Sequence, residues 1–303
     1  MLPGEKSNGD YIFNKTLSQE GVMKKIILIG FMLSMLFSQL SYAQNVHVLV
    51  NIWDGTEWER VKKFYDQGLL PNLNAVGQLH HLTCNEDCFG DKCTMTATTP
   101  QHAIMFTGCL ADVHGIFLFN DHYLIPDNIT VQELIKINNP SVLTAQFSGK
   151  KRNFGHSIFG NAMDEIDFYM HSKLINATLH ELTVKKLLEM WKDNSYFIIL
   201  HSRNPDEMGH GYGVYSHYYS DSLKQNDKIL GRILDTMKKY ENGAQTFVYV
   251  LSDHGFGCPT EGGHRCSPNT FITSNNPNLT GDPYMKNVAN YFLSHFGLSS
   301  VCK

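Results

Sequence analysis

Six acidic and imidazole side chains in this chain occur in combinations that are typical of metal ligands. Carboxylate and imidazole groups together suit zinc, and six of them are enough to bind two ions. Each of these residues alone is compatible with an ordinary turn or loop, so the prediction of a two-metal site depends on the whole set. The six residues are Asp54, Asp206, His210, Asp253, His254 and His264.

The polar stretch TATTPQHAIMFTG brings hydroxyl groups to the start of a predicted helix. Proline is favoured in the first turn of a helix, and a threonine before it can cap the free amide groups, so Thr99-Pro100 predicts a short helix that stops at Gly108. A hydroxyl group held there faces unpaired N–H donors, which suits a phosphate or sulfate oxyanion. The alternative is a threonine that caps the helix and does nothing more.

Apolar strands and amphipathic helices alternate along the chain and must position these residues. Strands that are apolar throughout are typical of parallel sheets covered on both faces. The pattern predicts an α/β fold, a three-layer α/β/α doubly wound and mostly parallel sheet, in one domain. The predicted strands are 46–53, 80–84, 141–149, 196–202, 246–252 and 269–274. The predicted helices are 56–67, 101–108, 131–137, 178–191, 220–240 and 284–297.

The ends of these strands indicate where the candidate ligands meet. In such sheets ligands bind at the edge formed by the carboxyl ends of the parallel strands. Asp54 and Asp253 directly follow strands, and Asp206 lies shortly after another. We therefore expect the six candidate ligands to converge at this edge, together with Thr98.

Several segments of the chain resemble the alkaline phosphatase superfamily, on the branch of the nucleotide pyrophosphatases and phosphodiesterases. The resemblance covers nearly the whole chain after residue 43, and it implies an alkaline phosphatase-like fold and hydrolysis of phosphate esters. The segments that carry it are the strand ending in Asp54-Gly55, TTPQHAIMFTG with VHGI after it, PDEMGHGYG, SDHG and GGH.

The same resemblance implies a role for each candidate residue. Thr98 would be the nucleophile, giving a phospho-threonine that water then hydrolyses. The cofactors would be two Zn²⁺ ions, although another divalent metal is compatible with such ligands. One zinc would be bound by Asp206, His210 and His264, and the other by Asp54, Asp253, His254 and Thr98.

Three further residues are candidates for binding substrate. Asn120, in HGIFLFND, resembles an asparagine that donates to a phosphate oxygen in phosphodiesterase relatives, but it lies about one residue later; the alternative is a turn residue. Lys150 and Arg152, in GKKR, resemble a Lys-x-Arg pair that neutralises the extra charge of a monoester in some phosphomonoesterases. The alternative is a basic surface loop.

The short loop before His264 keeps several activities open. Nucleotide pyrophosphatases usually have a long insertion there, so nucleotide specificity is not implied. We predict a secreted di-zinc hydrolase of phosphate esters, of the phosphodiesterase type. The alternatives are a phosphomonoesterase or sulfatase-like hydrolase, a phosphoethanolamine transferase, and a non-catalytic binding protein stabilised by metal. A sulfatase is disfavoured because Thr98 is neither Cys nor Ser followed by x-Pro-x-Arg.

The N-terminal region predicts export. We interpret residues 1–22 as an extension that is not native, 23–43 as a signal peptide cleaved after Ala43, and 44–303 as the catalytic domain. The apolar run contains Ser and Gln, so we expect a periplasmic or secreted protein without a permanent membrane anchor. The mildly acidic net charge of −4 at pH 7 argues against a nucleic-acid platform and leaves a small phosphate ester as the expected partner. The oligomeric state is left open.

The predicted export determines what the seven cysteines are expected to do. In an oxidising compartment, disulfides within two short loops are the expected arrangement, and the odd total leaves at least one thiol unpaired. A zinc knuckle fits less well, because the first cluster lacks a nearby fourth ligand. The clusters are Cys84, Cys88 and Cys93, then Cys258 and Cys266, while Cys109 and Cys302 are isolated.

Overall fold

The computed structural model describes residues 44–85, 88–89, 92–118, 124–150, 159–171, 177–256 and 267–302, and of these only the backbone at 88–89, 92–93, 160–161 and 177–179. Asn45–Lys303 form one compact unit. Several predictions lie outside the described residues: the extension 1–22, the signal peptide 23–43, Asn120, Arg152, His264, Cys258 and Cys266. Among the helices that are described, none combines the length and the apolar character needed to cross a membrane.

A seven-stranded mixed sheet forms the centre of the unit, in the order β2-β9-β8-β1-β7-β5-β6. The five strands from β8 to β6 are parallel to their neighbours, whereas β9 is antiparallel to β8 and to β2. The strands are β1 (Val46–Trp53), β2 (Leu79–Thr83), β5 (Leu143–Ser148), β6 (Phe168–His171), β7 (Tyr196–Ser202), β8 (Gln245–Leu251) and β9 (Asn269–Ser274). A separate two-stranded ribbon pairs β3 (Cys88–Phe89) with β4 (Lys92–Cys93).

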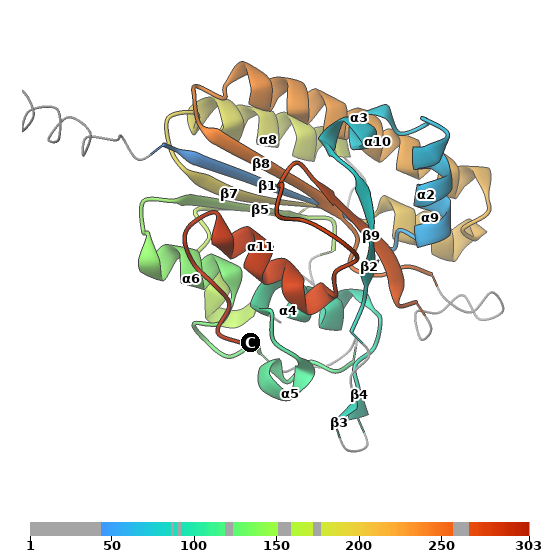
Figure 1. The fold of residues 1–303 in the computed structure, drawn as a ribbon, viewed down its shortest axis with the longest axis horizontal. Helices are drawn as coiled ribbons and strands as arrows, with labels where there is room; N and C mark the ends of the chain where they lie inside the picture. Colours follow the sequence, from blue (N-terminus) through green and yellow to red (C-terminus); the bar gives the residue numbers. More distant parts are fainter. Residues whose placement is uncertain are drawn as a thin grey trace, which may run out of the picture. The chain divides into compact units, whose positions relative to one another are not determined.

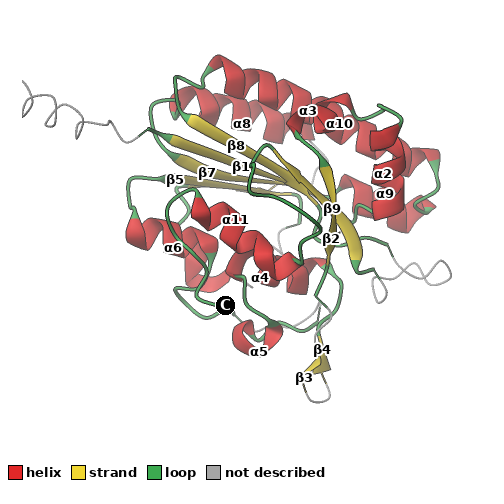
Figure 2. Cartoon of the chain, in the orientation of Figure 1, coloured by secondary structure: helices red, strands yellow, loops and turns green. Residues whose placement is uncertain are grey.

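Helices cover both faces of this sheet (Figures 1 and 2). One layer consists of α2 (Trp58–Asp66), α3 (Pro71–Val76), α8 (Ala177–Met190), α9 (Asn204–Tyr212) and α10 (His217–Lys239). The other contains α4 (Thr98–Thr107), α5 (Ala111–His114), α6 (Val131–Asn138) and α11 (Val288–Ser294). The predicted α/β/α layering is therefore confirmed.

The central strand β1 shows why its sequence is apolar throughout. Side chains alternate between the faces of a strand, and both faces of β1 are covered. Val48 and Val50 pack in one cluster with Ile104 of α4, while Leu49 packs in the other with Leu230 of α10. Full burial of each such aliphatic side chain contributes about 1.5–3 kcal/mol. The strand that directly precedes Asp54 is thereby held between two cores.

Several elements differ from the predictions. Helix α4 begins at Thr98 rather than at Gln101, because Ala97 is the extended N-cap residue. Helix α9 occupies a segment predicted as a loop, where three glycines between residues 209 and 213 obscure the helical pattern. Helix α3 and strand β6 were not predicted, since six and four residues are too few to show a period.

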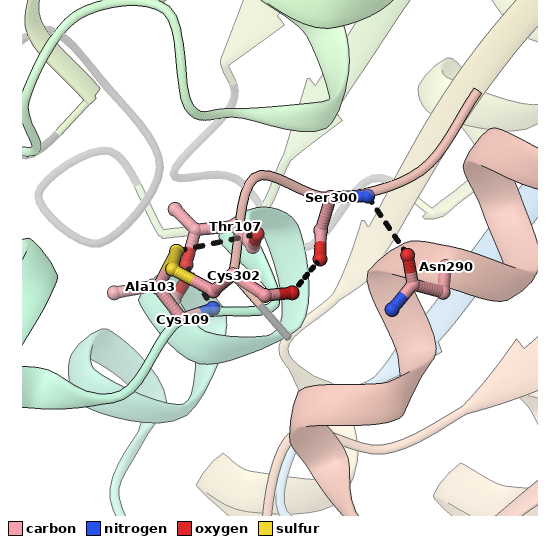
Figure 3. The surroundings of a disulfide bond; sticks show 6 residues. All are labelled: Ala103, Thr107, Cys109, Asn290, Ser300 and Cys302. Carbon is pink, nitrogen blue, oxygen red and sulfur yellow. Dashed lines mark hydrogen bonds between the residues drawn. A yellow bond between two sulfur atoms is a disulfide. The ribbon is translucent and has the colours of Figure 1, made fainter.

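A disulfide joins Cys109, two residues after the end of α4, to Cys302 (Figure 3). The two cysteines that seemed isolated in the sequence are thus partners. Thr107 lies beside the bond and accepts a hydrogen bond from the Cys109 N–H at 3.0 Å, and Ser300 donates to the Cys302 carbonyl at 2.6 Å. Cys84 is a buried thiol outside this bond and donates to the Asp253 carbonyl.

Candidate active site

Asp54 lies at the carboxyl end of β1, in a turn that is tied to the end of β8. The Gly55 N–H donates to Oδ1 of Asp253 at 3.2 Å, and the Thr56 N–H donates to Oγ of Ser252 at 2.9 Å. Gly55 has φ +63°, in the region that favours glycine, and a Cβ there would lie 2.7 Å from Oδ1 of Asp206. The turn therefore brings three of the predicted ligands to the same edge of the sheet.

Thr98 is the first residue of α4, and its buried hydroxyl group lies among these side chains. Its Oγ1 is 3.0 Å from Nε2 of His254 and donates to Oδ1 of Asp54 at 3.5 Å. Ala97, at the N-cap position, has no side-chain oxygen to cap the first turn. The hydroxyl group thus lies at the N-terminus of α4, where the helix dipole favours a bound anion.

Asp206 and His210 share one face of α9. Asp206 is buried in the first turn, and Nε2 of His210 lies 3.5 Å from its Oδ1, one turn later. The His210 ring packs edge-on against Phe256, with ring centroids 5.2 Å apart. The structure therefore brings together Asp206 and His210, the two described residues of the ligand set that was predicted to include His264.

Lys150 contacts the carboxylates of Asp54 and Asp206 and the hydroxyl group of Thr98. Its Nζ lies 2.5 Å from Oδ2 of Asp206, 2.7 Å from Oδ2 of Asp54 and 3.3 Å from Oγ1 of Thr98. Lys150 therefore lies among the predicted site residues, and its role in binding substrate stays a prediction. Burial lowers the pKa of this amine, but the charges of the nearby carboxylates outweigh it and raise the pKa above its usual range.

Two histidines without a predicted role also belong to this group. Nε2 of His102, on α4, lies 3.3 Å from Oδ2 of Asp253, and Nε2 of His201, on β7, lies 3.2 Å from Oδ2 of Asp54. The two rings meet edge-on, with centroids 5.1 Å apart. The signal for His102 was its position one turn after Thr98. For His201 it was its position near the end of a buried strand.

A family comparison covers all these residues. The profile of the family described as type I phosphodiesterase / nucleotide pyrophosphatase matches residues 48–273. The chain belongs to this family. The predicted resemblance to the nucleotide pyrophosphatases and phosphodiesterases is therefore confirmed.

Individual members of this phosphodiesterase family are distant in sequence. Ectonucleotide pyrophosphatase/phosphodiesterase family member 7 of Rattus norvegicus is 25% identical over 235 residues, which cover 70% of this chain and 50% of the rat protein. The chain thus spans about half the length of that relative. Such a distance leaves the substrate to be argued from the residues of this chain.

Solved structures show the same fold. The alkaline phosphatase from the Antarctic bacterium TAB5 has a TM-score of 0.61 at 14% identity, covering 84% of this chain and 98% of that one. Murine ectonucleotide pyrophosphatase / phosphodiesterase 5 has a TM-score of 0.57 at 14% identity, covering 84% and 96%. The alkaline phosphatase-like architecture is therefore shared by this phosphodiesterase-family chain.

Charge in the phosphodiesterase-family site is unevenly distributed. Burial raises the pKa of Asp54, but the Lys150 ammonium, His201 and His254 outweigh it and hold the pKa well below its usual range. Burial and the negative charge of Asp54 raise the pKa of Asp253. Burial lowers the pKa of His254, but Asp253 and Asp54 outweigh it and raise that pKa. Within the described residues of the site, carboxylates therefore outnumber permanent cations.

The donor atoms of this family member fit a divalent metal ion. Asp54, Asp253 and His254 each bring one potential ligand atom to within 4.8 Å of the others. Oδ2 of Asp253 is buried, and Nε2 of His102 at 3.3 Å and Nε2 of His254 at 3.5 Å approach it without forming a well-aligned hydrogen bond in the metal-free site. An unmatched buried carboxylate oxygen is costly without a cation or a donor, so these residues form a candidate metal site.

Proposed function

We propose that this chain is a metal-dependent phosphate ester hydrolase with Thr98 as its nucleophile. The single observation that carries the proposal is the position of the Thr98 hydroxyl group, 3.0 Å from His254 and in contact with Asp54 and Lys150. Membership of the phosphodiesterase family supports the reaction class. In this proposal one Zn²⁺ is held by Asp54, Asp253, His254 and Thr98, and a second by Asp206, His210 and His264.

Zinc, when bound, supplies Lewis acidity, which lowers the pKa of a coordinated hydroxyl group and stabilises charge on phosphoryl oxygens. The residues of the chain orient the reaction. Thr98 Oγ1 forms a bond to phosphorus while the bond from phosphorus to the leaving alcohol breaks, giving a phospho-threonine. In the metal-free site Asp54 Oδ1 lies 3.5 Å and His254 Nε2 lies 3.0 Å from Oγ1 of Thr98. Both groups would coordinate zinc when it is bound, so the hydroxyl proton passes to solvent and the leaving alcohol takes up a proton. Attack by water at phosphorus then breaks the bond between phosphorus and Oγ1 of Thr98, and one proton of the water restores the hydroxyl group. The product is inorganic phosphate from a monoester and a phosphate monoester from a diester.

Lys150 supports a second candidate function, that of a phosphomonoesterase. Its ammonium group lies 3.3 Å from the proposed nucleophilic oxygen, so it is within reach of a phosphoryl group bound there. A monoester carries more negative charge than a diester, and a nearby permanent cation favours it. Arg152 and Asn120 remain predicted substrate-binding residues in this proposal.

We also propose export to a periplasm or the extracellular space, with cleavage of the signal peptide 23–43 after Ala43 and residues 44–303 as the mature domain. The disulfide between Cys109 and Cys302 supports it, because such bonds persist mainly in oxidising compartments. The partner in this proposal is a small phosphate ester.

The test is steady-state hydrolysis by purified, zinc-loaded protein. We expect turnover of bis(4-nitrophenyl) phosphate, of 4-nitrophenyl phosphate, or of both, and no turnover by Thr98→Ala. The ratio of kcat/KM for the two esters separates the phosphodiesterase from the phosphomonoesterase. Zinc bound without hydrolysis of any phosphate or sulfate ester would overturn the proposal in favour of a metal-stabilised binding protein.

A further inference from the structure

Two fully buried histidines lie behind the carboxylates of one proposed zinc site. His102 comes from α4 and His201 from β7, and neither side chain is exposed to solvent. Each directs its Nε2 at one carboxylate: His102 at Oδ2 of Asp253, 3.3 Å away, and His201 at Oδ2 of Asp54, 3.2 Å away. The two rings touch, so these contacts form one buried group.

We propose that His102 and His201 are positioning residues, which donate Nε2–H to Asp253 and Asp54 and fix how these carboxylates face a bound metal ion. The inference rests on the proposed function only in taking these two aspartates as metal ligands. Hydrogen bonds to ligand carboxylates set their orientation, and loss of such outer contacts typically weakens metal binding 10- to 100-fold.

The remaining contacts of the two carboxylates support this role. Oδ1 of Asp253 accepts from the Gly55 N–H at 3.2 Å, which leaves Oδ2 toward His102. Oδ1 of Asp54 accepts from Thr98, which leaves Oδ2 toward His201 and Lys150. In each carboxylate one oxygen thus accepts a hydrogen bond, and the other lies within 3.3 Å of a buried imidazole nitrogen from another element. Rotation of either carboxylate would break a contact at each end.

A third metal ion is the competing interpretation, because His102, His201 and Asp253 also bring ligand atoms to within 4.8 Å of one another. The charge balance argues against it. Three carboxylates, at Asp54, Asp206 and Asp253, already face the Lys150 ammonium and two proposed dications. Another dication would add two positive charges inside a buried site that is already positive, and charge repulsion is strong at low dielectric constant.

The experiment compares two kinds of substitution at each histidine. His201→Gln and His102→Gln keep an N–H donor at about the reach of Nε2, whereas His201→Leu and His102→Leu remove it. The zinc dissociation constant is measured by competition with a chelating indicator, and the zinc content by elemental analysis. The visible absorption spectrum of the Co²⁺-substituted protein reports ligand geometry. Thermal unfolding of the metal-free protein reports stability.

His47→Leu is the matched control. His47 is a buried histidine on β1, stacked on Tyr196 near the start of the strand, so its loss tests burial without touching the metal site. We expect each site leucine variant to bind one of its two zinc ions 10- to 100-fold more weakly and to change the Co²⁺ spectrum. We expect the glutamine variants to lie within a few-fold of the wild type, and His47→Leu to change stability alone.

Three results would overturn the inference. One is unchanged zinc affinity in the leucine variants with lower stability, which indicates a purely structural role. Another is three zinc ions in the wild type and two in the leucine variants, which indicates a third ion site. The last is a wild type that binds no zinc, which also overturns the proposed function. Weakened zinc binding in the leucine variants, together with a wild type that hydrolyses no ester, would overturn the function and leave the positioning role supported.

Discussion

The ammonium nitrogen of Lys150 lies 2.5 Å from Oδ2 of Asp206, and the same nitrogen contacts Asp54 across the site. A single positive charge therefore connects two carboxylates that the sequence predicts as ligands of different metal ions. Because the raised pKa keeps this amine protonated, the charge is permanent at neutral pH.

Lys150→Met is expected to change the preference between esters. Loss of the cation should lower kcat/KM for 4-nitrophenyl phosphate about 10- to 100-fold and for bis(4-nitrophenyl) phosphate less, because the diester carries one negative charge fewer. Parallel kinetics with both esters check this. Lys186→Met, at an exposed lysine on α8, is the control. An equal decrease in kcat/KM for both esters would indicate that Lys150 maintains the structure of the site and does not select the monoester.

Thr98→Ala is expected to lower kcat by at least about a thousandfold, because removal of a nucleophile leaves only binding and electrostatic effects. Zinc content should fall little, since the other ligands remain. Stopped assays and elemental analysis of the same preparation check both statements. Thr99→Ala should keep its activity; if Thr99→Ala is inactive and Thr98→Ala active, the nucleophile has been assigned to the wrong threonine.

Asp253→Asn separates metal binding from stability. The raised pKa of Asp253 means that its ionised form destabilises the metal-free fold above the ordinary value of 3.8. We expect the metal-free variant to be more stable than the wild type at pH 7, and this difference to shrink as the pH falls toward 4 and Asp253 becomes protonated. Zinc affinity should fall more than about 100-fold. Denaturant unfolding and zinc titration measure these two effects. A metal-free variant that is less stable than the wild type at pH 7 would contradict the prediction.

His114, which lies outside the candidate active site, is expected to make the stability of the fold depend on pH. Burial lowers its pKa to about 4, and its Nδ1 accepts from the Ile116 N–H. The unfolded chain binds a proton near pH 6.5 while the folded chain does not, so stability should fall as the pH drops from about 6.5 to 4. His114→Asn should reduce that slope by up to roughly 1.4 kcal/mol per pH unit. Urea unfolding of the metal-free proteins at several pH values checks this, and parallel slopes would contradict it.

The disulfide between Cys109 and Cys302 is expected to stabilise the fold strongly, because it closes a loop with a sequence separation of 193. Replacing both cysteines by alanine should lower the free energy of unfolding by about 2–5 kcal/mol. Calorimetry of the variant and of the wild type, with and without reductant, checks this. A wild type whose unfolding is insensitive to reductant would argue against the bond.

Much of the fold follows from local patterns in the sequence. Each apolar run that predicted a central strand is a strand, because burial on both faces leaves no polar positions in 48–50 or 197–200. Asp54 and Asp253 were found because a charge directly after such a run is conspicuous. Helix α9 was missed because glycines weaken the helical pattern, even though it positions Asp206.

The rest of the site depends on contacts between distant elements. His201 is part of an apolar strand, and only the pairing of β7 with β1 brings it to Asp54. His102 lies in a helix that is buried on all sides, so no amphipathic pattern shows which neighbour it faces. Lys150 reaches the site through a long side chain, whose direction a sequence does not encode.

Gly55 allows the turn after β1 to approach the first turn of α9 closely. Its hydrogen atom faces the space next to the Asp206 carboxylate, where a methyl carbon would lie 2.7 Å from Oδ1. Any larger residue would collide with Asp206, including its Cα atom, so α9 would have to move away from the turn. The absence of one carbon atom therefore lets the first turn of α9 lie directly against the end of β1.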